Sequence, residues 1–93
     1  MEDLNILRNK IDEINEELRR LFLERMKISK AVVEFKMKSG MEIFDSEREK
    51  EVIEKVLGMD DSKEMKPYLD EFFTNLMEIS REYQQEVRDK EKK

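Results

Sequence analysis

Large apolar residues recur along the first third of the chain at alternating steps of three and four positions. The spacing places them on one side of a helix, because three or four residues make about one turn. Arg25 occupies the position in this line where the next apolar residue is due. The pattern therefore predicts a long helix whose seam is interrupted by one cation. The apolar members are Leu4, Leu7, Ile11, Ile14, Leu18, Leu21, Ile28, Val32 and Phe35.

This first helix is predicted to run from about Leu4 to Lys38, with Asp3 as its N-cap and Gly40 just after its end. Such a helix is roughly 50 Å long, whereas a compact domain of this chain length is only about 30 Å across. The chain's own shorter helices do not cover such a rod. We therefore expect a second copy of the chain to pack along it, as a homodimer with two-fold symmetry.

A loop over residues 39–45 and a second helix from Ser46 follow, and Gly58 ends this helix. Ser46 and Glu49 match a capping box, in which the Glu49 side chain reaches back to the N-cap. The second helix has an apolar stripe that we expect to be buried. The members of the stripe are Val52, Ile53, Val56 and Leu57.

Pro67 fits the first turn of a third helix that is predicted to reach about Arg88. Two polar residues, Ser80 and Gln84, continue its apolar line, either as part of a site or as a solvated helix end. The charged residues 89–93 are expected to be a disordered tail. The fold class is therefore all-α, one domain over residues 1–93, with one long N-terminal helix and two shorter ones in an intertwined dimeric bundle.

Composition narrows the possible chemistry. The sequence has neither Cys nor His, which excludes disulfides, the usual zinc sites and His or Cys nucleophile–base pairs. A net charge of −5 argues against a general nucleic-acid surface, and no apolar run is long enough to cross a membrane. We expect no cofactor or metal. We see no signal peptide and expect a cytoplasmic protein.

The polar residues of the three helices suggest a site for a small dianion. Arg25 and Lys36 share a face of the first helix, roughly 16 Å apart along its axis. Arg8 lies roughly 26 Å before Arg25, so it reaches the same ligand only from an antiparallel partner chain. Such a site suits a reaction that needs charge stabilisation and conformational restraint. Alternatively, Arg25 forms a buried structural ion pair, and the others are solvated or capping residues. The remaining candidates are Arg48, Glu49, Ser80 and Gln84.

Four short motifs in order resemble those of the all-helical chorismate mutases, over about Leu4 to Val87. They are Leu-Arg8-Asn-Lys-Ile-Asp, Glu-Arg25 with Lys36 eleven residues later, Asp45-Ser-Glu-Arg48-Glu49, and Ser80-Arg-Glu-Tyr-Gln84. The resemblance implies an intertwined homodimer of three-helix protomers. It also implies the Claisen rearrangement of chorismate to prephenate, a step toward phenylalanine and tyrosine. The loop before Asp45 lacks the Pro that is often found there in the family.

The resemblance also implies residue roles. Arg25 and the partner subunit's Arg8 would hold the substrate's carboxylates, with Ser80 assisting. Lys36 and Gln84 would donate hydrogen bonds to the ether oxygen of the breaking C–O bond.

The ring hydroxyl would be held by Glu49 and by the backbone near Asp45, with Arg48 lining the same pocket. Val32, Val52 and Met77 match apolar wall positions. Two other functions stay open at this point: an isochorismate-pyruvate lyase, and a non-catalytic dimerisation or regulatory module. The chain is either a free-standing enzyme or a domain of a bifunctional protein.

Overall fold

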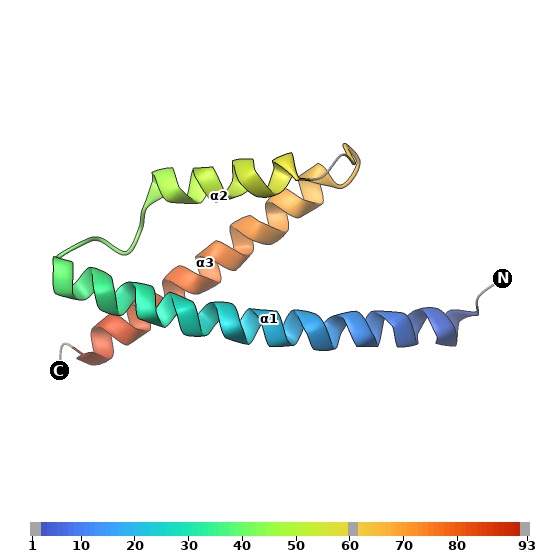
Figure 1. Ribbon diagram of the computed structural model, residues 1–93, viewed down its shortest axis with the longest axis horizontal. Helices are drawn as coiled ribbons and strands as arrows, with labels where there is room; N and C mark the ends of the chain where they lie inside the picture. Colours follow the sequence, from blue (N-terminus) through green and yellow to red (C-terminus); the bar gives the residue numbers. More distant parts are fainter. Residues whose placement is uncertain (1–2, 60–61, 92–93) are drawn as a thin grey trace.

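The computed structural model describes residues 3–59 and 62–91, and within these ranges it contains three α-helices and no strand. The helices are α1 (Leu4–Ser39), α2 (Ser46–Gly58) and α3 (Lys66–Glu91). Helix α3 runs obliquely between the other two and contacts both, while the N-terminal half of α1 extends beyond the rest of the molecule (Figure 1). The predicted all-helical fold class is confirmed.

Both ends of α1 follow the sequence prediction. The Asp3 carboxylate accepts a hydrogen bond of 2.9 Å from the backbone N–H of Ile6, which satisfies a donor that the helix itself cannot pair. At the other end Gly40 adopts a φ of 69°, a conformation that residues with a Cβ rarely take. The N–H of Met41 then reaches back 2.8 Å to the carbonyl of Lys36, and the chain turns into the loop.

The N-cap of α2 is Asp45, not Ser46. The Asp45 backbone is extended, and its carboxylate accepts a 3.0 Å hydrogen bond from the N–H of Arg48. A carboxylate satisfies this N–H and also complements the positive end of the helix dipole. The alternative in which Glu49 serves only a capping box is therefore wrong, and its side chain instead forms an ion pair with Arg81 of α3.

Helix α3 continues through residues 89–91, where we expected a disordered tail. Two side-chain contacts, each between residues one helical turn apart, stabilise these last residues of the helix. Gln85 donates a hydrogen bond to Asp89, and Lys90 forms an ion pair with Glu86. The basic residues in this last turn also suit the negative end of the helix dipole. Residues 92 and 93 of the expected tail lie outside the described part.

The interior of the protomer is small. Among the described residues the buried apolar side chains are Val33, Ile43, Met77 and Val87. The α2 stripe that we expected to be buried is only half-buried. The radius of gyration is 16.8 Å, compared with about 12 Å for a compact chain of this length. The protomer is therefore an open arrangement of helices.

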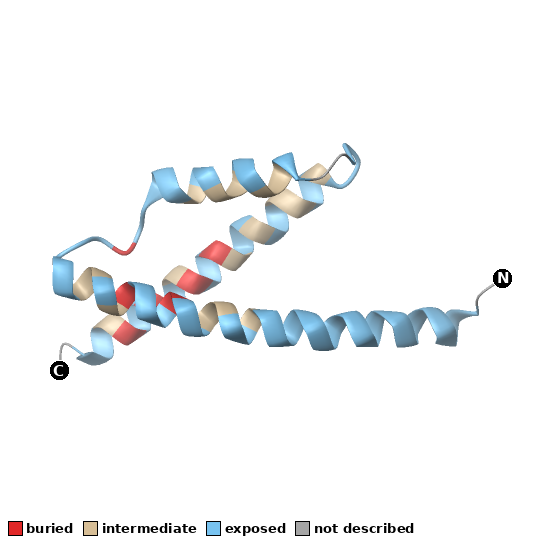
Figure 2. Ribbon diagram, in the orientation of Figure 1, coloured by how far each residue is buried: buried red, intermediate tan, exposed pale blue. Residues whose placement is uncertain are grey.

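The apolar seam of α1 is largely uncovered. Every residue from 3 to 21 is exposed, and Figure 2 shows this half of the helix without a buried position. Ile11, Ile14 and Leu18 leave 56%, 58% and 46% of their surface exposed. The described protomer thus leaves about half or more of the surface of these residues uncovered, although they have the spacing of a helix–helix seam.

Candidate active site

A cavity of about 180 Å³ lies between the C-terminal half of α1, the start of α2 and the middle of α3. It brings together seven of the eight residues that the sequence analysis singled out: Arg25, Lys36, Asp45, Arg48, Glu49, Ser80 and Gln84. The expected apolar wall residues, Val32, Val52 and Met77, line it too. Helical spacing thus assembles one site from three separate segments of the chain.

The polar residues of α3 face α1. Ser80 and Gln84 are 7% and 8% exposed, so they do not form a solvated helix end. The Arg25 guanidinium donates a 2.5 Å hydrogen bond to the Ser80 hydroxyl, and the Gln84 amide donates one of 2.9 Å to the Ser29 carbonyl. A side-chain amide carries two N–H groups, so Gln84 keeps a second donor for a ligand.

Arg25 has no ion pair with any carboxylate in the described part of the chain. Its partial burial lowers the pKa of the guanidinium below the usual range, and the nearby Arg48 charge lowers that pKa further. Both effects disfavour the cation, and both would be offset by an anion in the cavity. The alternative in which Arg25 forms a structural ion pair is therefore not what the described residues show.

Lys36 reaches from α1 to the loop that precedes α2. Its ammonium donates a 2.9 Å hydrogen bond to the carbonyl of Ile43, a buried loop residue. An ammonium has three N–H donors, so two remain for other acceptors. Arg88 of α3 holds the same loop by donating a 2.8 Å hydrogen bond to the carbonyl of Met41. The loop is thus anchored from both α1 and α3.

Glu49 pairs with Arg81, a residue that the sequence analysis did not assign to the site. The Arg81 Nε and the Glu49 carboxylate oxygen are 2.8 Å apart, and the guanidinium carbon lies 4.7 Å from the centre of the Phe44 ring. Arg81 follows Met77 by four positions and precedes Gln84 by three, so helical spacing alone places it on the site face. Ser29 and Ile43 also line the cavity and were not anticipated.

The cavity is cationic in an acidic protein. Four basic side chains (Arg25, Lys36, Arg48, Arg81) and two acidic ones (Asp45, Glu49) line it, which leaves a net charge of +2. The whole chain carries −5. A small dianion matches this excess. The described residues include no group of three or more potential metal ligands, and no described helix is long and apolar enough to cross a membrane.

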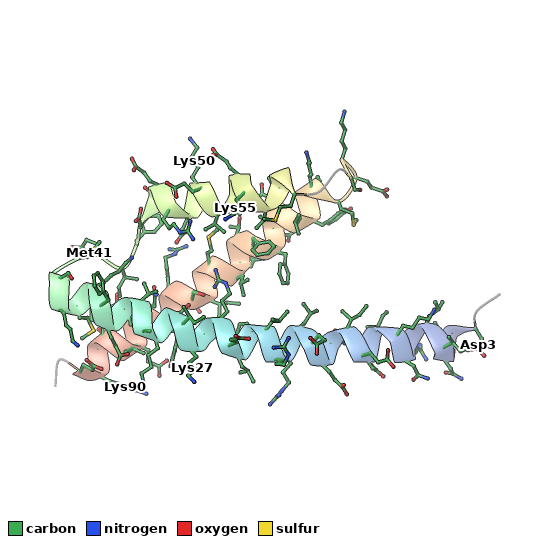
Figure 3. All side chains as sticks on the ribbon, in the orientation of Figure 1. Asp3, Lys27, Met41, Lys50, Lys55 and Lys90 are labelled. Carbon is green, nitrogen blue, oxygen red and sulfur yellow. The ribbon has the colours of Figure 1, made fainter. Side chains whose placement is uncertain are left out.

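Arg8 does not line the cavity. It lies in the exposed half of α1, 17 positions before Arg25, which is roughly 26 Å along a helix. No arginine side chain spans that length, so Arg8 has no role in the cavity of its own protomer. In Figure 3 the side chains of this part of α1 project on both sides of the helix, and the ribbons of α2 and α3 lie well away from its N-terminal end.

The fold and the cavity together define a class: an all-helical protein whose three helices surround a cavity lined by more basic than acidic side chains. Comparison with known protein families matches residues 7–85 to chorismate mutase type II. The match covers most of the chain, and the protein belongs to this family.

Two relatives agree with the family match. A bifunctional chorismate mutase/prephenate dehydratase of Aquifex aeolicus is 47% identical over 57 residues, which is 61% of this chain and 16% of that protein. A chorismate mutase of Methanocaldococcus jannaschii is 39% identical over 56 residues, 60% of this chain and 57% of that protein. These aligned segments thus span less than two thirds of either relative.

Proposed function

We propose that the protein is a chorismate mutase, which converts chorismate to prephenate by an intramolecular Claisen rearrangement. The observation that carries this proposal is the uncompensated Arg25 guanidinium, which lies in one cavity with Lys36 and Gln84. Family membership and the names of the two relatives support the same reaction. Isochorismate-pyruvate lyase activity has no observation in its favour.

The residues present suit a reaction without an intermediate. The rearrangement breaks a C–O bond and forms a C–C bond in one pericyclic step, so it needs no proton transfer, nucleophile or cofactor. The enzyme instead folds the enolpyruvyl arm over the ring. Arginine clamps on the two carboxylates do this, because a fork-shaped guanidinium fixes both the position and the orientation of a carboxylate.

Besides this conformational restraint, the enzyme raises the rate by electrostatic stabilisation of the transition state. Negative charge grows on the ether oxygen as the C–O bond stretches, and donors aimed at that atom stabilise the transition state more than the substrate. Lys36 and Gln84 supply these donors with the N–H groups that Ile43 and Ser29 do not use. Removing one such donor costs on the order of 3–4 kcal/mol, or about a hundred- to a thousandfold in rate.

The proposal includes a homodimer. The seam of α1 is exposed in the protomer, and a second copy of the chain would cover it. An antiparallel α1 would also bring the partner subunit's Arg8 to the cavity, where it would hold one substrate carboxylate while Arg25 holds the other. Each site would then depend on both chains.

We place the protein in the cytoplasm, with the enzymes that use prephenate for phenylalanine and tyrosine.

Loss of the chorismate absorbance band on adding purified protein, with prephenate identified as the product, tests the proposal. We expect turnover by the wild type and a loss of about a hundredfold or more in Arg25→Ala. Arg20→Ala is the matched control, because Arg20 pairs with Glu17 and Glu24 on the surface of α1, outside the cavity. No turnover by a folded wild type, or equal rates in Arg25→Ala and wild type, would overturn the assignment.

A further inference from the structure

The negative charge of Glu49 opposes the binding of a dianion in this cavity. Its carboxylate lines the same cavity as the cations, and its side chain is only 24% exposed. An unpaired carboxylate there would repel a dianionic ligand, because like charges interact more strongly in a partly buried site than in water. The site therefore needs something that neutralises Glu49 without removing it.

Arg81 is placed to do this. It comes from α3, and its Nε lies 2.8 Å from a Glu49 carboxylate oxygen, in an ion pair whose N–H direction does not meet the geometry of a hydrogen bond. Its side chain is 36% exposed, so water screens the pair incompletely. Arg48, a cavity-lining cation at the start of α2, is paired with Glu51 instead, at 3.6 Å, and both of these side chains are mostly exposed. Among the described residues, Arg81 is therefore the cation that compensates Glu49.

Phe44 holds Arg81 in that position. The guanidinium carbon lies 4.7 Å from the ring centre, a distance at which a cation is attracted to the face of an aromatic ring. Phe44 belongs to the loop that Lys36 and Arg88 anchor through the carbonyls of Ile43 and Met41. The guanidinium is thus fixed between an α2 carboxylate and a loop ring. A lysine, with its flexible stem and point charge, would keep the charge but lose this geometry.

We infer that Arg81 is a positioning residue of the active site: it neutralises and orients the Glu49 carboxylate so that Glu49 can hold a hydroxyl of a doubly negative substrate without repelling it. The inference rests on the proposed function, because it assumes that the cavity binds chorismate. It assigns a role to a residue that does not itself touch the reacting atoms.

The inference predicts a specific kinetic pattern. Substrate and transition state are both dianions, so repulsion by an uncompensated Glu49 weakens the binding of both and raises KM more than it lowers kcat. Arg81→Met keeps an apolar stem of similar length. We expect its KM to rise about tenfold or more and its kcat to change less than about threefold. Arg81→Lys should recover part of the lost affinity.

A double-mutant cycle with Glu49→Gln tests whether Arg81 acts through Glu49. In the Glu49→Gln background no carboxylate needs compensation, so Arg81→Met should then raise KM less than about twofold. Arg20→Met is the control, because Arg20 also pairs with carboxylates but lies outside the cavity. Circular dichroism of each variant checks the fold, and should Arg81→Met unfold, Arg81→Gln replaces it in the cycle.

The outcomes are distinct. An equal rise of KM in both backgrounds, or an Arg81→Met enzyme with the wild-type KM, would overturn the role of Arg81 while leaving the proposed function intact. A kcat loss with unchanged KM would also contradict it. A folded wild type without turnover would instead remove the proposed function, and this inference with it.

Discussion

Arg25 of α1 and Ser80 of α3, 55 positions apart in the sequence, meet through a 2.5 Å hydrogen bond on the wall of the cavity. The bond orients a guanidinium that has no carboxylate partner in the described part of the protein. It leaves the other N–H groups of Arg25 for a ligand. Ser80 therefore positions the cation on which the proposed function depends.

Removing the Ser80 hydroxyl should lower kcat/KM less than removing the Arg25 guanidinium. We expect Ser80→Ala to lower kcat/KM about tenfold, the cost of one hydrogen bond to a charged group, and Arg25→Ala to lower it about a hundredfold or more. Steady-state kinetics on chorismate measures both. A Ser80→Ala enzyme as damaged as Arg25→Ala would show that the hydroxyl itself binds the substrate's carboxylate.

With Gln84 as a donor, we expect the rate to be independent of pH near neutrality, because a side-chain amide donates whatever the pH. In Gln84→Glu only the protonated carboxyl group donates, so the rate should be highest at low pH and fall as the pH rises. The fall should approach tenfold per pH unit once most molecules are ionised. The profile of kcat/KM between pH 5 and 8 tests this. A wild-type profile that falls steeply over this range would contradict the role of Gln84.

Two inactive variants should restore activity when they share a dimer. A mixed dimer of Arg8→Ala and Arg25→Ala has one site with both arginines intact and one with neither. Co-refolding equal amounts gives mixed dimers as about half of the total, so we expect about a quarter of the wild-type specific activity.

The control for this mixing experiment is Arg25→Ala with Lys36→Ala. Both residues line the cavity of the same protomer, so every site in a mixed dimer would still lack one of them. No activity should return. Restored activity in the control, or none in the Arg8 mixture, would rule out a site shared in the way we propose. Sedimentation velocity on the wild type measures the dimer directly.

The two glycines should respond in opposite ways to alanine. Gly40 has a φ of 69° and open space around its missing side chain, so Gly40→Ala should lose about 1 kcal/mol of stability from backbone strain alone. Gly58 is helical and also has open space, so Gly58→Ala should gain up to about 1 kcal/mol. Urea unfolding measures both. A stable Gly40→Ala protein would contradict the left-handed turn.

Sequence reasoning was most successful where it depended on helical spacing. The limits of α1 and the presence of Arg25, Lys36, Ser80 and Gln84 in one cavity follow from periods of three and four residues. These positions share faces of helices that must pack together. The family resemblance added the roles, and those remain predictions.

What the sequence did not reveal depends on contacts between helices. Asp45 and Ser46 are adjacent residues that both suit an N-cap, and the structure selects Asp45. In the sequence Arg81 cannot be distinguished from the other charged residues of α3, and its pairing with Glu49 is a contact between α3 and α2. No local pattern encodes a pairing across 32 positions, because charged residues are nearly half of this chain.

The uncovered half of α1 has a consequence for stability. In the proposed dimer most of the apolar contacts of residues 3–21 would come from the other chain, so the folded state would be favoured by mass action. The melting temperature would then climb as the protein is concentrated and drop as it is diluted. An assay at nanomolar protein would measure subunit dissociation together with turnover.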